Sequence, residues 1–217
     1  MFVFLVSMNR YSNGEYGHQR YAAHGAGAFL LEIVKIFLLA AIIIFPVRIF
    51  LFQPFFVQGA SMEPNFHDGE YLIVNEWGYK HTMVGMAADP LFSVESFREL
   101  KRGDVVVFRY PKNPSQFFVK RIVGLPSETV EVKDGLVTVF NDTYPSGIVL
   151  DESEYIESAD TTRGSDRVEL GEDEYFVLGD NRSHSHDSRS WGPLPKEFVM
   201  GKVVFRVWPF IDMGFIS

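Results

Sequence analysis

The stretch "QGASMEPN" (58–65) contains a serine whose setting suits a nucleophile. Ser61 follows Gly59 and Ala60, whose small side chains let another backbone approach closely, and Pro64 restricts the chain shortly afterwards. A serine hydroxyl is a weak nucleophile near neutral pH, so it needs a base within hydrogen-bond reach. Without that base, Ser61 is an ordinary turn residue.

Lys120 is one candidate for the base. It lies inside the apolar stretch "FFVKRIV" (117–123), which predicts a strand. Burial disfavours the ammonium form, and lowering a lysine pKa from about 10.4 to about 7 corresponds to about 4 kcal/mol. The neutral amine produced in this way could accept the proton of Ser61. A solvated strand lysine is the simpler interpretation of this stretch taken alone.

Histidine is the other candidate for the base. His184 and His186 lie in "GDNRSHSHDSRSWG" (179–192), and the following Asp187 suggests a Ser-His-Asp arrangement with Ser61. Alternate spacing on a strand would also put both imidazoles on one face, as in a metal site. However, the stretch has a turn-like composition and lacks a clear third ligand. We therefore expect exposed loop histidines, with no metal or other cofactor.

Composition limits the possible functions. The chain has 217 residues and a net charge of −8, which argues against a nucleic-acid partner. Ten of the 28 acidic residues lie between Asp151 and Glu174, a segment that we interpret as a solvated loop. The absence of cysteine excludes disulfides, thiol catalysis and thiolate metal sites.

An almost wholly apolar segment, interrupted by Glu32, Lys35 and Arg48, precedes the serine. The charge-free run Ile36–Val47 has 12 residues, short of the roughly 20 that a membrane-spanning helix needs. Glu32 and Lys35 can pair on one helix face, however, and the two basic side chains can reach toward opposite interfaces. We predict one transmembrane helix over residues 27–52; a buried core helix is the alternative.

Residues 1–26 would form an N-terminal tail, which we expect in the cytoplasm. Arg10 and Arg20 are opposed by Glu15, so the positive-inside signal is weak. Met8 is an alternative start of translation.

The remainder, residues 53–217, has the pattern of a mostly antiparallel β domain. Short runs rich in β-branched and aromatic residues predict strands at Tyr71–Val74, Asp104–Tyr110, Phe117–Val123, Thr129–Lys133, Leu136–Phe140, Tyr175–Leu178 and Val203–Trp208. Asp134-Gly135 predicts the tight turn of a hairpin over residues 130–140. We expect insertions near residues 80–100 and 141–174.

Four sequence blocks follow the apolar segment in order: "QGASMEPNFHDGEYLIVN" (58–75), "KRGDVVVFRYP" (101–111), "FVKRIVGLPSETV" (118–130) and "VLGDNRSHSHDSRSWGPLP" (177–195). Together with the N-terminal anchor, they closely resemble the bacterial type I signal peptidases, which are membrane-bound serine proteases of the Ser/Lys class. The resemblance runs from about Phe29 to Trp208. It implies a coiled antiparallel β-sheet peptidase domain behind one N-terminal transmembrane helix.

The resemblance also implies roles for individual residues. Ser61 matches the nucleophile, Lys120 the general base, and Ser185 the residue whose hydroxyl binds and orients the catalytic lysine. A charged cluster beneath the site would hold the loop of Ser185 against the strand of Lys120; its members are Arg121, Asp180, Asp187 and Arg189. Gly59 stands where many relatives have a serine that helps to bind the oxyanion, so the backbone N–H of Ser61 would carry more of that task.

The implied substrates are signal peptides of exported preproteins, cut after small residues in an Ala-x-Ala pattern. The matching positions place Val57, Met62 and Val119 in the wall of the cleft. The substrate would add as a strand beside the segment that leads to Ser61. We expect the catalytic domain on the extracytoplasmic side of the plasma membrane, with the lipid bilayer and the export translocon as partners.

The apolar residues at both ends of this domain suggest contact with the membrane. Phe50, Phe52, Phe55 and Phe56 lead from the anchor to the serine, and "WPFIDMGFIS" (208–217) ends the chain. We hypothesise that they hold the cleft at the depth of the membrane surface; burial of some of these rings in the core is an equal alternative.

Other functions fit parts of the pattern. A specialised Ser/Lys peptidase for pilins or one secretion system would keep the chemistry and change the substrate. A non-catalytic, anchored β domain that binds secreted partners has no reason to carry Ser61, Lys120 and Ser185 together. A self-cleaving repressor with the same dyad would lack the anchor and carry a DNA-binding domain.

Overall fold

The computed structural model describes residues 26–50, 52–80, 82–86, 89–94, 96–156, 162–164 and 167–216. The chain divides into an N-terminal unit and a β unit, and each is described by itself. Apart from Ala26, the predicted cytoplasmic tail (residues 1–26) lies outside the described residues.

The described part of the N-terminal unit belongs to the helix α1 (Ala26–Phe50), whose residues from Ile44 onward are counted with the β unit. Its 25 residues give a length of about 37 Å, enough for the about 30 Å of a bilayer's hydrocarbon core. The stretch Gly27–Ile44 has a mean hydropathy of 2.5, and none of it is buried. The buried core helix is therefore not supported. By length and composition, α1 can cross a membrane. It ends at Phe50, and strand β1 begins at Phe52.

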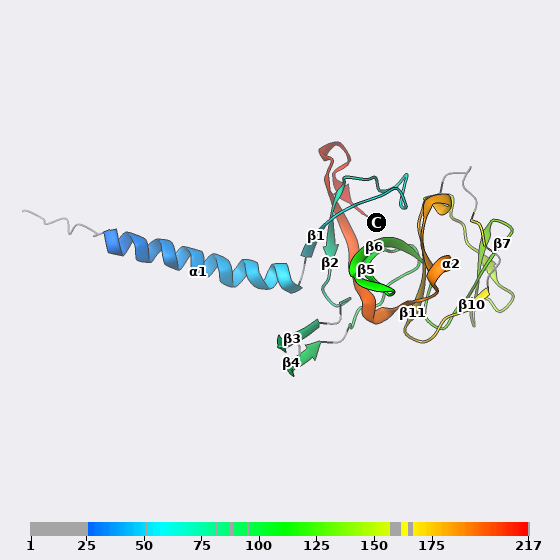
Figure 1. Cartoon of the computed structure of the whole chain (residues 1–217), viewed down its shortest axis with the longest axis horizontal. Helices are drawn as coiled ribbons and strands as arrows, with labels where there is room; N and C mark the ends of the chain where they lie inside the picture. Colours follow the sequence, from blue (N-terminus) through cyan, green and yellow to red (C-terminus); the bar gives the residue numbers. More distant parts are fainter. Residues whose placement is uncertain are drawn as a thin grey trace, which may run out of the picture. The chain divides into compact units, whose positions relative to one another are not determined.

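The β unit consists of strands joined by turns and a few short helical segments (Figure 1). The strands are β1 (Phe52–Phe56), β2 (Tyr71–Asn75), β3 (Thr82–Met86), β4 (Asp89–Val94), β5 (Val105–Tyr110), β6 (Asn113–Gly124), β7 (Thr129–Lys133), β8 (Leu136–Phe140), β9 (Ile148–Val149), β10 (Arg167–Glu169), β11 (Glu174–Leu178), β12 (Leu194–Pro195), β13 (Val199–Trp208) and β14 (Gly214–Phe215). The helical segments are η1 (Arg182–His184), α2 (Ser188–Trp191), η2 (Lys196–Phe198) and η3 (Phe210–Asp212).

The strands form two main antiparallel sheets. The larger sheet has the order β1-β2-β13-β5-β6-β11-β12, with β14 paired to β13. The smaller sheet has the order β10-β7-β8-β9. Figure 1 shows β5 and β6 curling through the middle of the unit, with β11 and α2 between them and the smaller sheet. The predicted mostly antiparallel β class with one N-terminal apolar helix is confirmed.

Each predicted strand is present, with shifts of a few residues at the ends. The hairpin over residues 130–140 is confirmed as well, because β7 pairs with β8 and the turn residues Asp134 and Gly135 have φ angles of 52° and 83°. Positive φ at both positions matches the twist of the flanking strands, and aspartate followed by glycine adopts it readily.

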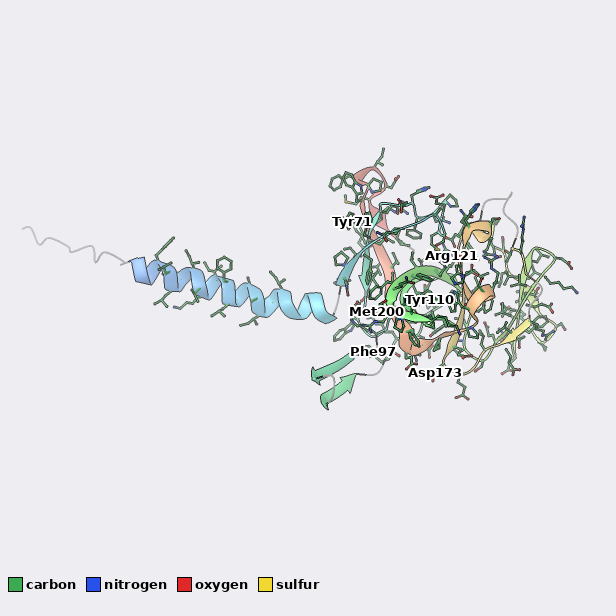
Figure 2. All side chains as sticks on the ribbon, in the orientation of Figure 1. Tyr71, Phe97, Tyr110, Arg121, Asp173 and Met200 are labelled. Atoms are coloured by element: carbon green, nitrogen blue, oxygen red, sulfur yellow. The ribbon has the colours of Figure 1, made fainter. Side chains whose placement is uncertain are left out.

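β6 ties the hydrophobic core together. Val119 packs against one buried cluster with Val57 and Met62, whereas Ile122 and Val123 belong to two others. Figure 2 shows side chains filling the space around β5 and β6, with Tyr110 and Arg121 labelled on these two strands. Because successive β6 residues pack in separate clusters, the position and register of β6 are strongly determined.

The two predicted insertions contain regular structure. The first, near residues 80–100, includes the antiparallel hairpin β3–β4. The second, near residues 141–174, adds β9 and β10 to opposite edges of the smaller sheet. The prediction of a solvated acidic loop is wrong for Glu152, whose side chain is only 11% exposed and is paired with Arg182.

Candidate active site

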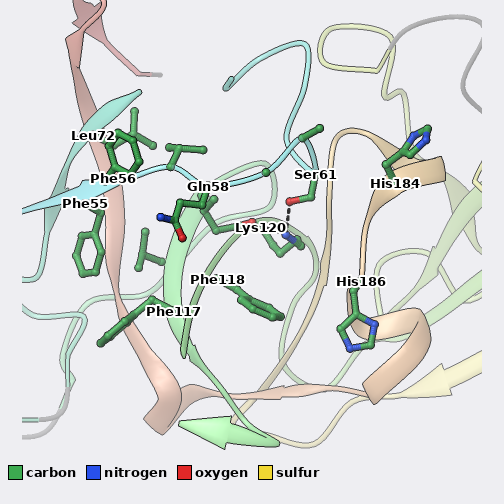
Figure 3. Close-up of a pocket in the computed structure, with 15 residues that line it drawn as sticks. Phe55, Phe56, Gln58, Ser61, Leu72, Phe117, Phe118, Lys120, His184 and His186 are labelled. Atoms are coloured by element: carbon green, nitrogen blue, oxygen red, sulfur yellow. Dashed lines mark hydrogen bonds between the residues drawn. The ribbon is translucent and has the colours of Figure 1, made fainter. Parts of the chain in front are cut away.

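A cleft of about 310 Å³ lies over the larger sheet. Its walls come from the end of β1 and the segment up to Ser61, from Phe117–Lys120 of β6, and from the loop that follows β11. In Figure 3, Ser61 and Lys120 lie at the centre, with Phe55 and Phe117 to one side and His186 to the other.

Ser61 is positioned by a turn and by the loop after β11. Gly59 has a φ of +90°, a left-handed conformation that side chains disfavour, which accounts for glycine at this position. The backbone N–H of Asn181 donates to the carbonyl of Ser61 at 3.1 Å. A Cβ on Gly179 would clash with this carbonyl, so the loop approaches Ser61 closely only because residue 179 is glycine.

Lys120 points from β6 to the serine. Its Nζ lies 2.6 Å from Ser61 Oγ and 2.8 Å from the carbonyl of Val119, to which it donates. The residue is 4% exposed. Its register partner on β5 is the fully buried Val106, and Nζ lies 5.5 Å from the centre of the Phe118 ring.

This environment weakens the affinity of the Lys120 amine for its proton. Burial lowers its pKa from 10.5 to about 8, while the charges of Asp187 and Asp180 act in the opposite direction. With a pKa of about 8, about a tenth of the amine is neutral at pH 7. The neutral amine can accept the serine proton, so the pair can act as nucleophile and base.

Two ion pairs involve the loop that follows β11. Arg121 donates to both carboxylate oxygens of Asp180, at 2.8 Å and 2.7 Å. Arg189 likewise donates to both oxygens of Asp187, each at 2.8 Å. Burial opposes ionisation of Asp187, yet hydrogen bonds from Arg189 hold the pKa of that carboxyl below its ordinary value. Burial raises the pKa of the Asp180 carboxyl, but its hydrogen bonds from Arg121 favour the charged form, so both carboxylates serve as anchors for the loop.

The N–H of Gly59 is not available to an oxyanion, because it donates to Asp68 Oδ1 at 2.7 Å. The backbone N–H of Ser61 is thus our candidate donor to an oxyanion at this site.

His184 and His186 lie on the rim of the cleft and are exposed. His186 Nε2 is 3.1 Å from the Tyr110 hydroxyl, and His184 Nδ1 is 3.1 Å from Asn181 Oδ1. Within the described parts of the chain, no group of three or more His, Cys, Asp or Glu side chains could hold a metal ion.

Comparison with known proteins identifies the family. The model of the family described as "Signal peptidase, peptidase S26" matches residues 30–208. The chain belongs to this family. It is 34% identical over 187 residues to the signal peptidase I of Bacillus licheniformis, covering 85% of this chain and 91% of the relative. It is 32% identical over 192 residues to the probable signal peptidase I-2 of Synechocystis sp., covering 86% of this chain and 77% of the relative.

A similar solved structure is the crystal structure of a signal peptidase I from Enterococcus faecalis V583, at 30% identity and a TM-score of 0.40, covering 49% of this chain and 98% of that one. The resemblance to signal peptidase I found in the sequence is thus confirmed by the family match. Family membership makes the chain a peptidase, and with its apolar helix α1 it indicates a membrane-anchored one.

The structure brings together most of the residues that the signal peptidase resemblance singled out. Val57, Gly59 and Val119 line the cleft with the dyad. Met62 does not: it is 1% exposed and packs in the core below, so our placement of Met62 in the cleft wall is corrected.

Ser185 also differs from the expectation. Its hydroxyl is buried and makes no hydrogen bond to Lys120; it lies against Gly179, close enough to Asp187 to help lower the pKa of that carboxyl. The absence of a Cβ on Gly179 leaves the room that the hydroxyl occupies.

Sequence reasoning missed several residues that support the pair Ser61 and Lys120. Asn181 and Gly179 lie within the quoted block "GDNRSHSHDSR", so the block itself was a signal. Glu152 and Tyr155 lie in the acidic insertion, where nothing in the sequence distinguishes them from their neighbours.

Proposed function

We propose that this chain is a serine endopeptidase that removes N-terminal signal peptides from exported preproteins, using Ser61 and Lys120. The observation that carries the proposal is the 2.6 Å separation of Lys120 Nζ and Ser61 Oγ, at a lysine that burial deprives of solvent.

The reaction has two stages. Neutral Lys120 takes the proton of Ser61 as Oγ attacks the carbonyl carbon before the scissile bond, and the resulting ammonium protonates the leaving amine. This step produces an acyl-enzyme and releases the mature protein. Lys120 then activates a water that attacks the ester, which restores Ser61 and releases the signal peptide. The N–H of Ser61 would stabilise the oxyanion in both stages.

The cleft supports small residues before the cut. On one side of the dyad it is lined by apolar side chains, among them Val57, Leu72 and Val119, which suit small apolar residues such as alanine. β11 pairs with β6 only from Arg121 onward, so the edge of β6 next to the cleft is not paired with another named strand of the described chain. An extended Ala-x-Ala segment could add there as a strand.

The location follows from the substrate. A signal peptide emerges next to the bilayer, and α1 would anchor the peptidase at the same surface. We place the β unit on the extracytoplasmic side of the plasma membrane. Phe52 and Phe56 are about half exposed, whereas Phe55 packs against the core. The export translocon is the machinery expected to deliver preproteins to this site.

The test uses the full-length chain in detergent with a preprotein whose signal peptide ends in Ala-x-Ala. Ser61→Ala, Lys120→Ala and Lys120→Arg should each lower the cleavage rate by at least about a thousandfold, because guanidinium stays charged and neither alanine variant retains the dyad. Lys133→Ala, at an exposed strand lysine, is the matched control and should cleave normally. A Lys120→Ala enzyme with most of its activity would disprove the lysine base.

Substrate choice is tested separately. Replacing alanine at the first or third position before the cut by tryptophan should block cleavage, because a cleft of about 310 Å³ would have to hold all three residues before the cut. Equal cleavage of both preproteins would contradict the proposed preference for small residues.

A further inference from the structure

The acidic insertion sends one carboxylate into the interior of the β unit. Glu152 accepts two hydrogen bonds from Arg182, at 2.6 Å and 2.9 Å, and the Arg182 side chain is 1% exposed. The Tyr155 hydroxyl donates to the same carboxylate at 2.9 Å. Burial raises the pKa of the Tyr155 hydroxyl, so it remains a donor. Two parallel hydrogen bonds to a buried guanidinium fix both position and orientation.

Arg182 connects this carboxylate to the loop that holds the nucleophile. Its Nε donates to the carbonyl of Gly179 at 3.0 Å, and its own carbonyl accepts from Arg189 at 2.8 Å. The adjacent residue Asn181 donates to the carbonyl of Ser61. A shift of Arg182 would therefore be transmitted to Ser61 through one backbone hydrogen bond.

Tyr155 contacts the other two parts of the site. Its ring lies under the guanidinium of Arg121, 4.3 Å from the ring centre, and Arg121 directly follows Lys120. Its carbonyl accepts from Asn65 Nδ2 at 2.6 Å, and the same amide donates to Asp180 at 2.9 Å. Asn65 belongs to the turn that begins at Ser61. Tyr155 thus touches the strand of the base and the turn of the nucleophile.

We propose that Glu152 and Tyr155 form a clamp that sets the distance and orientation of Ser61 relative to Lys120. They are positioning residues, and the proposal rests on the proposed function because the dyad is what they position. The insertion would then be part of the catalytic framework, although it lies outside the four blocks that resemble the family.

The charges explain why Glu152 matters. Without its carboxylate, Arg182 would be a buried cation without its counter-ion, an unfavourable state. Asp180 is the other carboxylate on which the charge of Arg182 acts, and it is already paired with Arg121. Competition for Asp180 would loosen the Arg121 pair next to Lys120. The carboxylates whose charges act on Lys120 itself are Asp187 and Asp180.

The test compares Glu152→Gln with Glu154→Gln, an exposed glutamate of the same segment, in the full-length chain in detergent. Glu152→Gln should lower kcat about fivefold with little change in KM, because misalignment of reacting groups affects the chemical step. Competition of Arg182 for Asp180 should weaken the charge of that carboxylate on Lys120 and so lower the Lys120 pKa. The rise of kcat/KM with pH should then move to lower pH. Glu154→Gln should match the wild type in both measurements.

A second pair keeps the clamp testable if Glu152→Gln does not fold. Tyr155→Leu removes the ring under Arg121 and should lower kcat several-fold, whereas Tyr155→Phe keeps the ring and should retain most of the rate. The clamp would be overturned if Glu152→Gln kept the wild-type kcat and pH profile, even with a lower thermal stability. If only Tyr155→Leu folds, the same result in that variant would overturn it. If the wild type itself cleaves no preprotein, or Ser61→Ala cleaves equally well, the proposed function fails instead.

Discussion

Replacing Lys120 should make the protein more stable near neutral pH. The folded state lowers the Lys120 pKa from 10.5 to about 8, a difference that corresponds to about 3 kcal/mol of disfavoured charge. Lys120→Met removes that charge and keeps a side chain of similar length. It also removes the hydrogen bonds of Nζ to Ser61 and Val119, worth about 1 kcal/mol each. A net gain of about 1–2 kcal/mol should remain.

The sign of the pH dependence follows from proton linkage. Below pH 8 the amine is charged in the folded and the unfolded chain, and the folded state carries the full cost. Between pH 8 and 10.5 the folded protein loses the proton first, so wild-type stability rises with pH. Above 10.5 both states are neutral and the cost is gone. The advantage of Lys120→Met should therefore be largest at or below pH 7 and shrink by pH 10.

Thermal unfolding of the full-length chain in detergent at pH 7 and pH 10 measures this directly. At pH 7, Lys120→Met should raise Tm by about 3–6 °C. Lys133→Met, at an exposed strand lysine, should change Tm little at either pH. The reasoning is refuted if Lys120→Met is no more stable than the wild type at pH 7. A gain of equal size at pH 10 would refute it too, since packing alone would then account for the effect.

Three further predictions follow from the backbone and the surface. Gly179→Ala should reduce cleavage at least about a hundredfold, because its Cβ would clash with the carbonyl of Ser61 and displace the nucleophile; initial rates measure this. Gly201→Ala should lower the free energy of unfolding by about 2 kcal/mol in a denaturant titration, because its Cβ would meet the backbone of β2. Ile211 and Phe215 are 91% and 87% exposed, so changing both to serine in a chain of residues 52–217 should weaken sedimentation with phospholipid vesicles about tenfold.

Matched variants separate these effects from general damage. Gly214→Ala introduces a Cβ into open space and should leave both cleavage and unfolding unchanged. Leu136→Ser alters an exposed apolar residue of β8, in the smaller sheet, and should not change vesicle binding. If Leu136→Ser weakened vesicle binding as much as the double change, a specific membrane contact of Ile211 and Phe215 would be ruled out.

Local patterns in the amino-acid sequence were enough to predict the main secondary-structure elements. Periodicity and turn chemistry involve only neighbouring residues, so a local pattern was sufficient to predict these elements. Examples are the apolar run that forms α1, the runs of β-branched residues that form β5 and β6, and the turn at Asp134-Gly135. The sequence also singled out Ser61 and Lys120, because the quoted blocks are specific to one family.

How these residues meet depends on the pairing of strands that are distant in the sequence. Ser61 and Lys120 are 59 positions apart, and they come together because β2 and β5 both pair with β13 and β6 lies beside β5. The placement of Met62 below the cleft and the inward direction of Glu152 depend likewise on distant partners. Burial depends on everything that packs around a residue, and so does the pKa of the Lys120 amine. A local sequence pattern does not contain this information.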